Sequence, residues 1–234
     1  MRIALPDLLA SRKGRLTAFF LLYVTEGIPL GFTATAIAAQ MRRQGLGPAD
    51  IGAFVGSLYL PWAFKWAVGP FVDVFSSDRF GRRSSLAVFA FLTVVPTLWL
   101  AYVMWQAGWI MPVDIKTPNR PHPSTVLVIT FWATVIVYNI FQGLYYGIRT
   151  ALYMDITNPA VAATQFTAYM ALLNLCISYT AWWQGHAVER LGYPRTLVLD
   201  CVFGLSALLL LPLMRPRRAG LPSTETAATS PATA

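Results

Sequence analysis

The chain has 234 residues, of which 56% are hydrophobic and 12% are charged, and its formal net charge is +8. A soluble domain carries about 25% charged residues, so composition excludes a fold that must hide this much apolar surface from water. The basic excess does not indicate nucleic acid, because lysine and arginine are scattered between long apolar runs, as in membrane proteins. Cys176 and Cys201 lie in apolar segments and predict neither a disulfide framework nor a metal site, and no cofactor is expected.

Six apolar segments follow one another along the chain, and each is long enough to cross about 30 Å of hydrocarbon as a helix. They cover residues 16–41, 51–75, 84–106, 125–151, 161–188 and 196–214. The sequence therefore predicts an all-α integral membrane protein with one six-helix bundle over residues 16–214. Residues 1–15 are expected to form a cytoplasmic N-terminal segment. Residues 215–234, which are small, polar and proline-bearing, are expected to form a disordered cytoplasmic tail.

Lysine and arginine favour one orientation of this bundle. The side that holds both termini is the richer in basic residues, and it includes Arg79, Arg82 and Arg83 between the second and third spans. Basic loops tend to stay in the cytoplasm, so we expect both termini there. The expected location is the bacterial inner (plasma) membrane, with the lipid bilayer as the first partner and no nucleic-acid partner.

Two charged residues interrupt the first two spans. Glu26 and Lys65 each lie about ten residues from the cytoplasmic end of their helix, which at about 1.5 Å per residue is about 15 Å deep. An unpaired charge at that depth costs on the order of several kcal/mol, so we expect a Glu–Lys pair or a water-filled cavity, where the carboxylate can carry a proton. The alternatives are a purely structural ion pair and a lysine that reaches the interface past Trp66.

The same two spans carry glycine and proline at this depth, in EGIPLGF (26–32) and LPWAFKWAVGP (60–70). Such residues interrupt a membrane helix and free backbone carbonyls that can line a cavity. We therefore expect a break in both helices. Glycine and proline are also commoner in membrane helices than in soluble ones, which leaves an ordinary structural origin open.

The fourth span carries a polar stripe. Spacings of three, four and three residues place its members on one helix face: Asn139, Gln142, Tyr146 and Arg149. On the fifth span Asn174 shares a face with Ser178. We expect these faces to line a hydrated path for an anionic solute, because Arg149 is a full positive charge; interhelical hydrogen bonds, about 0.5–2 kcal/mol each, are the alternative. Asp200, near the outer end of the sixth span, is expected to be interfacial, with a direct role as the alternative.

The loop after the second span resembles a known family. GPFVDVFSSDRFGRR (69–83) is similar to the loop between helices two and three of the major facilitator superfamily, where Gly-x-x-x-Asp leads into Arg-x-Gly-Arg-Arg. The resemblance implies a gating loop whose residues are Gly69, Asp73, Asp78, Arg79, Gly81, Arg82 and Arg83. In the family one aspartate serves both parts of the pattern, whereas here Asp73 and Asp78 divide them. A topology signal alone is the other interpretation of the basic run.

Other stretches resemble one branch of that superfamily. YVTEGIPLGF, GLGPADIGAFVGSLYLPWAFKWAVGPFVD and AATQFTAYMALLNL are similar to AmpG-like muropeptide permeases and acetyl-coenzyme A transporters. Members have two six-helix halves, and the resemblance implies one half here: three helices similar to helices one to three, then three similar to helices ten to twelve, the counterparts of four to six. Two copies around a twofold axis would rebuild a central path, so a homodimer or another membrane partner is expected.

These observations favour a secondary active permease for a small organic, anionic solute, such as a muropeptide or an acyl-coenzyme A compound, with proton symport and alternating access. The alternative is a transport-inactive six-helix membrane assembly protein derived from a shortened carrier. An intramembrane enzyme is not expected, because the sequence shows no nucleophile and base pair, no H-E-x-x-H motif and no P-loop.

Overall fold

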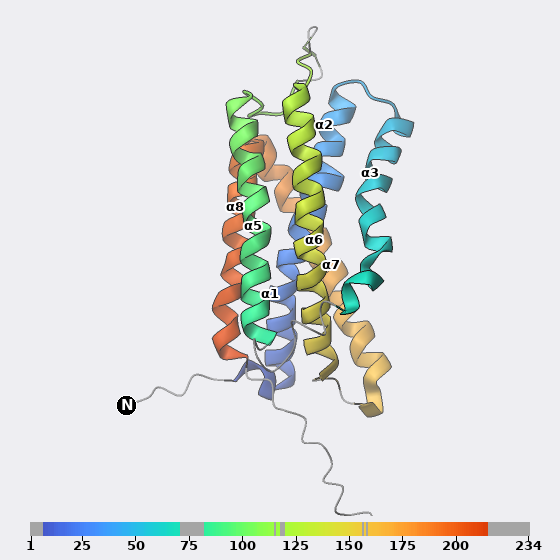
Figure 1. Cartoon of the computed structure of the whole chain (residues 1–234), viewed down its shortest axis with the longest axis vertical. Helices are drawn as coiled ribbons and strands as arrows, with labels where there is room; N and C mark the ends of the chain where they lie inside the picture. The colour runs from blue at the N-terminus through green and yellow to red at the C-terminus, as the bar shows by residue number, and fades with distance from the viewer. Residues whose placement is uncertain are drawn as a thin grey trace, which may run out of the picture.

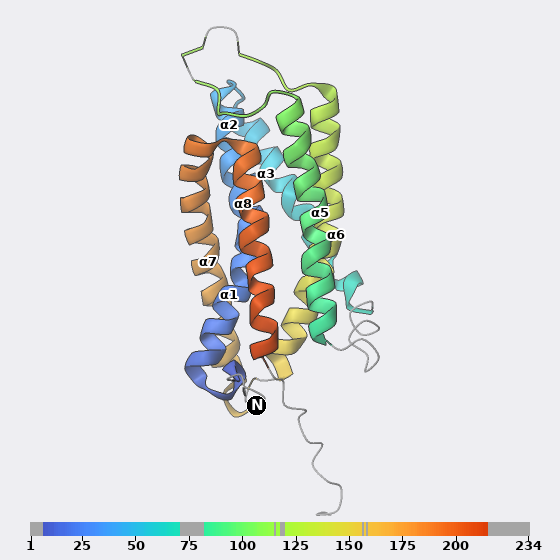
Figure 2. The ribbon, with the colours of Figure 1, turned by 90° about the vertical axis from the view of Figure 1, so that its left-hand side faces the viewer.

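The computed structural model describes residues 7–70, 82–114, 116–117, 120–155, 157 and 159–214. Within these ranges, the side chains of several residues, Glu26 and Lys65 among them, fall outside the description. Every regular element of the described part is a helix. The long helices form one upright bundle and connect at alternating ends (Figure 1, Figure 2).

The first helical segment changes its winding in mid-course. A short 3-10 helix, η1 (Leu8–Ala10), precedes α1 (Arg12–Gly31); the π-helix η2 (Phe32–Ile37) and α2 (Ala38–Arg43) follow without a gap. Pro29 removes a backbone donor from α1, so the regular hydrogen-bond ladder is weakened just before the wider turns of η2 begin. The interruption expected from EGIPLGF is confirmed, as a change from α- to π-helix.

The second helical segment is interrupted as well. α3 spans Pro48–Ala63, contains Pro61 in its last turn, and gives way to the 3-10 helix η3 (Lys65–Val68). Pro61 cannot donate a helical hydrogen bond, which explains why the α-helix ends two residues later. The break expected from LPWAFKWAVGP is confirmed. The remainder of the span expected over 51–75 lies in residues 71–81, outside the described part.

The remaining elements complete the bundle. They are α5 (Arg82–Gln106), α6 (Thr125–Asp155), η4 (Pro159–Val161), α7 (Ala162–Leu191), α8 (Tyr193–Ser206) and η5 (Ala207–Leu213). Gly192 alone separates α7 from α8, at a φ of 83°, which L side chains rarely adopt. This one-residue turn holds α7 and α8 close together, which matters for the site below.

Several helix pairs follow the pattern of an inverted repeat. α1 packs on α7, α3 on α6, α5 on α8, α5 on α6 and α1 on α8. When α1, α3 and α5 are exchanged in order for α6, α7 and α8, these pairs map onto one another, whereas the packing of α7 on α8 has no α3–α5 counterpart of comparable extent among the described residues. Corresponding helices run in opposite directions, as α1 and α6 do in Figure 1. The described packing is therefore partly that of two three-helix units of opposite orientation.

The outside of the bundle is apolar and its inside holds polar groups. Trp99, Ile129 and Ile140 are exposed, whereas Gln142 and Arg149 are buried. A soluble protein shows the reverse distribution. Three segments are long and apolar enough to cross a membrane: Ser84–Gln106, Thr125–Met154 and Tyr193–Leu213. The described part is thus a helical membrane protein with three candidate spans, and the prediction of six spans stays a prediction.

The first and last described elements, η1 and η5, both pack on α1 and lie at the same end of the bundle (Figure 1). The turns between α2 and α3, α5 and α6, and α7 and α8 lie at the opposite end. At that end Arg43 forms an exposed ion pair with Glu189, at 3.2 Å between Nη2 and Oε1. The described ends of the chain therefore share one side of the bundle, as the predicted topology requires.

Candidate functional site

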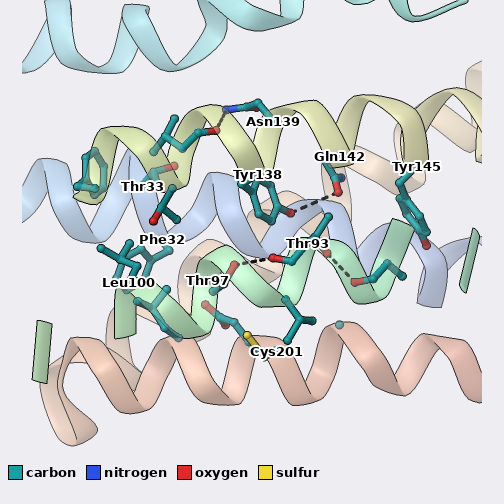
Figure 3. Close-up of a pocket in the computed structure, with 18 of the residues that line it drawn as sticks. Phe32, Thr33, Thr93, Thr97, Leu100, Tyr138, Asn139, Gln142, Tyr145 and Cys201 are labelled. Carbon is teal, nitrogen blue, oxygen red and sulfur yellow. Dashed lines mark hydrogen bonds between the residues drawn. The ribbon is translucent and has the colours of Figure 1, made fainter. Parts of the chain in front are cut away.

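A cavity of about 100 Å³ lies inside the bundle, where α5, α6 and α8 surround the start of η2 (Figure 3). Its walls are mostly apolar, but polar side chains reach it from three of these helices. They are Thr93 and Thr97 on α5, Thr134, Tyr138, Asn139 and Gln142 on α6, and Asp200 and Cys201 on α8. A few polar groups converging in an apolar cavity are the usual form of a small-molecule or ion site.

Three threonine hydroxyls of the cavity, on α5 and α6, donate to backbone carbonyls. Thr93 Oγ1 donates to the Ala90 carbonyl at 2.7 Å, and Thr97 Oγ1 donates to the Thr93 carbonyl at 2.9 Å. Thr134 Oγ1 donates to the Pro96 carbonyl on the neighbouring helix at 3.4 Å. A hydroxyl has one hydrogen and two lone pairs, so each of these oxygens keeps acceptor capacity after its bond is made.

The polar residues of α6 are partly satisfied within their own helix. Tyr138 Oη donates to Gln142 Oε1 at 3.3 Å, and Asn139 Nδ2 donates to the Val135 carbonyl at 2.8 Å. Gln142 is buried, and its Nε2 has no hydrogen-bond partner in the described part of the chain. A buried amide donor without a partner costs about 1–3 kcal/mol, so this group is available to a solute or to water.

Asp200 is held from the neighbouring helix. Its Oδ1 accepts a hydrogen bond of 2.9 Å from Gln184 Nε2 on α7. The whole residue is only 3% exposed, and its Oδ2 has no hydrogen-bond partner among the described residues. The side chain therefore lies inside the bundle, and the expected depth of Asp200 near the membrane interface stays a prediction.

Arg149 is the largest fully buried side chain of the described part. Its guanidinium lies over four tyrosine rings, at 4.7 Å from Tyr23, 5.4 Å from Tyr145 and from Tyr146, and 6.0 Å from Tyr153. Nη1 also donates to the Leu22 carbonyl of α1 at 3.4 Å. Desolvated cation–π contacts are worth about 2 kcal/mol each, which offsets part of the cost of burying the charge.

Tyr145 connects the two polar regions. It lines the cavity, and its ring also lies beside the Arg149 guanidinium. Gln142, Tyr146 and Arg149 follow one another along successive turns of α6. An amide, a phenol ring and a guanidinium therefore stand in a row that leads from the cavity toward one end of the bundle.

The structure brings together four of the predicted path residues, all on α6. Asn139 and Gln142 line the cavity, and Tyr146 and Arg149 lie one and two turns further on. Asn174 is exposed on α7 and is not among the described residues that line the cavity.

The side chains of Glu26 and Lys65 lie outside the described part, so their pairing stays a prediction. Their backbones belong to α1 and to η3, and η3 packs on α6.

The predicted gating loop is described only at its edges. Gly69 is exposed and follows η3, and Arg82 and Arg83 begin α5 with side chains outside the description. Four members lie wholly outside the described residues: Asp73, Asp78, Arg79 and Gly81. Their gating role stays a prediction.

Sequence reasoning gave no role to the threonines of α5 and treated a direct role of Asp200 only as an alternative. Thr93 and Thr97 are four residues apart in an otherwise apolar helix, and that spacing was a usable signal for a polar face. Asp200 lies in the last apolar run, where an acidic residue is expensive and therefore informative. The prediction for Asp200 used its distance from the end of the span and not the helix face on which it lies.

Comparison with known proteins gives one partial similarity. No protein-family model matches the chain, and no solved structure matches it. A stretch of 97 residues is 30% identical to a folate-biopterin transporter from Synechocystis sp., and it covers 41% of this chain and 17% of that relative. The similarity is to a transporter and supports membrane transport in general, and not an enzyme.

Proposed function

We propose that the chain is a half-size secondary carrier of the major facilitator type, similar to the AmpG-like branch, which moves an organic anion across the bacterial inner membrane. Both termini would lie in the cytoplasm. The observation that carries the proposal is a mostly apolar cavity with converging polar side chains, which the ring of Tyr145 separates from a buried arginine, inside a bundle whose surface is apolar. A protein with a purely structural role has no need of a buried amide donor and carboxylate oxygen without partners beside such a cavity.

The partial inverted repeat of the bundle supports the same architecture. Two three-helix units of opposite orientation are the building plan of each half of this superfamily. The packing pairs α1–α7, α3–α6 and α5–α8 follow that plan. Six membrane-spanning helices would result if the segments around α1, α3 and α7 also cross the bilayer.

Arg149 is the group that we assign to the anion. A guanidinium binds carboxylate and phosphate through paired N–H donors, and it stays charged at any relevant pH. In this structure its charge rests against the rings of Tyr23 and Tyr146. An incoming anion would replace aromatic contacts with charge-assisted hydrogen bonds, which are the stronger interaction. Phosphate-bearing and carboxylate-bearing solutes both fit this chemistry.

Glu26 joins this region by helical register. Leu22, whose carbonyl accepts from Arg149, precedes it by four residues on α1, so both positions belong to one helix face. We propose that Glu26 carries a proton near the anion site. Lys65 belongs to η3, which packs on α6, so it would approach the path from the other side of that helix.

The size of the cavity indicates a closed state. About 100 Å³ is well below the 300–1,000 Å³, approximately, of sites that hold organic ligands. A carrier must therefore open it, and η2 and η3 supply irregular helical turns where α1 and α3 can bend. Residues 69–83, which contain the proposed gating loop, follow η3 directly.

A second copy of the chain would complete the path. α3 exposes Gly52 and Gly56, and α7 exposes Asn174 and Ser178. Small residues let helices approach closely in a membrane, and amides and hydroxyls form hydrogen bonds between them. We propose a homodimer along these faces. Crosslinking in native membranes tests it: Asn174→Leu should reduce the dimer fraction, whereas Leu175→Ala on the same exposed face should not.

Uptake by proteoliposomes tests the transport proposal. Folate, biopterin, a muropeptide and acetyl-coenzyme A are offered with and without an inward proton gradient. We expect saturable uptake of at least one of them, a strong reduction in Arg149→Lys, and loss of the response to the gradient in Glu26→Gln. Lys65→Met should also reduce uptake.

Arg195→Lys is the matched control, because this exposed arginine also lies over an aromatic ring, at 5.8 Å from Trp105. Absence of uptake for every solute, together with a stable co-purifying membrane protein, would contradict the carrier and favour the assembly role.

A further inference from the structure

The carboxylate of Asp200 is buried, and only one of its two oxygens has a hydrogen-bond partner among the described residues. Gln184 occupies Oδ1, while Oδ2 has no partner among the described residues, and the residue is 3% exposed. Because Asp200 lines the cavity, a ligand that enters this space can supply the missing partner of its second oxygen.

Four of the hydroxyl groups that line the cavity with Asp200 keep lone pairs after donating their hydrogens. The hydroxyls of Thr93, Thr97 and Thr134 donate their hydrogens to backbone carbonyls, at oxygen–oxygen distances of 2.7, 2.9 and 3.4 Å. Tyr138 likewise donates to Gln142. The oxygens that remain can accept a hydrogen bond or coordinate a cation, and they cannot donate. Together with the carboxylate they make an environment for positive charge.

The charge balance of the cavity points the same way. Among the described lining residues Asp200 is the sole acidic or basic side chain, and Tyr138, Tyr145 and Cys201 are the other titratable ones. From α7 the facing group is the neutral Gln184. The Tyr145 ring separates Arg149 from the cavity, so the positive charge of Arg149 belongs to the tyrosine-lined region and not to the cavity.

The volume restricts the ligand to a small one. A cavity of about 100 Å³ is well below the roughly 300–1,000 Å³ of sites that hold organic ligands, so an ion with a few waters is the better fit. Hard cations prefer oxygen ligands of the kind gathered here.

We propose that Asp200 and the oxygens of Thr93, Thr97 and Thr134 form a binding site for a single positive charge, either a sodium ion or a proton on the carboxyl. The site shares none of its named residues with the Arg149 region. Its use as the coupling site rests on the proposed function: α8 packs on α5 and is bonded to α7 through Gln184, so occupancy would change how these helices hold together.

Thermal unfolding of the purified full chain in mild detergent tests the site without transport. Melting temperatures are compared in sodium chloride and choline chloride at equal ionic strength, across a range of pH. A sodium site predicts stabilisation of the natural chain by sodium, by about 4 °C or more at saturation. A proton site predicts no sodium effect but a pH dependence of the melting temperature. In either case Asp200→Asn should abolish the response.

Two further variants keep the test decisive. Asp114→Asn, at an exposed aspartate of the connecting loop, should respond as the natural chain does. If Asp200→Asn does not fold, Thr97→Val with Thr134→Val retains the carboxyl and should weaken the sodium response at least tenfold in midpoint concentration, or shift the pH midpoint.

An unchanged response in Asp200→Asn, a response lost in Glu26→Gln instead, or a natural chain indifferent to both cations and pH would overturn the proposal. Ion-dependent stabilisation without uptake of any solute would support the site while contradicting the proposed function.

Discussion

Arg149 and Asp200 are both buried charged residues of one bundle, yet their surroundings differ. The arginine is enclosed by tyrosine rings and belongs to a dense core that includes Phe19 and Cys176. The aspartate is bonded on one side only and faces a cavity. The arginine is held by ring contacts and by the Leu22 carbonyl, so an anion must displace existing contacts, whereas a ligand of the aspartate can meet an oxygen that has no partner among the described residues. Two buried charges can therefore both belong to binding regions and still differ in how much of the site is already filled.

Removal of the guanidinium should have the largest effect. Arg149→Leu removes a guanidinium that contacts four tyrosine rings, at about 2 kcal/mol per contact, and takes a donor from the buried Leu22 carbonyl, at about 1–3 kcal/mol. Arg149→Lys keeps the charge but loses the planar contacts to four rings. We expect both variants to lower the melting temperature and abolish uptake. Arg195→Lys, which is exposed, should change stability by less than about 0.5 kcal/mol.

Removal of the hydrogen bond from Gln184 to Asp200 should lower stability by a smaller amount. Gln184→Leu removes the donor to Asp200 Oδ1 and leaves a buried acceptor, at a cost of about 1–3 kcal/mol. Chemical or thermal unfolding in detergent measures the change. Gln106→Leu is the control, because this glutamine is exposed and bonds only to Tyr102 one turn away. Equal effects of the two substitutions would contradict a buried, braced carboxyl.

Loss of the hydrogen bond that joins α6 to α5 in the cavity wall should have the smallest effect on stability. Thr134→Val removes the hydroxyl that reaches the Pro96 carbonyl on α5, and such interhelical bonds in membranes contribute about 0.6 kcal/mol on average. The same replacement at Thr167, whose hydroxyl bonds within α7 on the exposed face, should leave stability unchanged within error. A larger loss of stability in Thr167→Val than in Thr134→Val would contradict this expectation.

The sequence predicted the interruptions of the first two helices because glycine and proline act locally. The predicted face of α6 was also sound, since regular helical spacing alone places Asn139, Gln142, Tyr146 and Arg149. Local spacing says nothing of which helix stands opposite. The tyrosine enclosure needs Tyr23, 126 positions before Arg149, and the Asp200 brace depends on the tight turn at Gly192. Both features depend on tertiary contacts, which local sequence patterns do not predict.

The two cysteines allow the central claim, a hydrated cavity beside Asp200, to be measured directly. Cys201 lines the cavity, whereas Cys176 is packed in the core with its thiol donating to the Phe20 carbonyl. Single-cysteine chains, made by Cys176→Ala or Cys201→Ala, are exposed in membranes to a small, water-soluble methanethiosulfonate. The account predicts that Cys201 reacts at least about tenfold faster than Cys176, because a thiolate must meet water and reagent to react. Equal rates, with both thiols reacting only after unfolding, would contradict it.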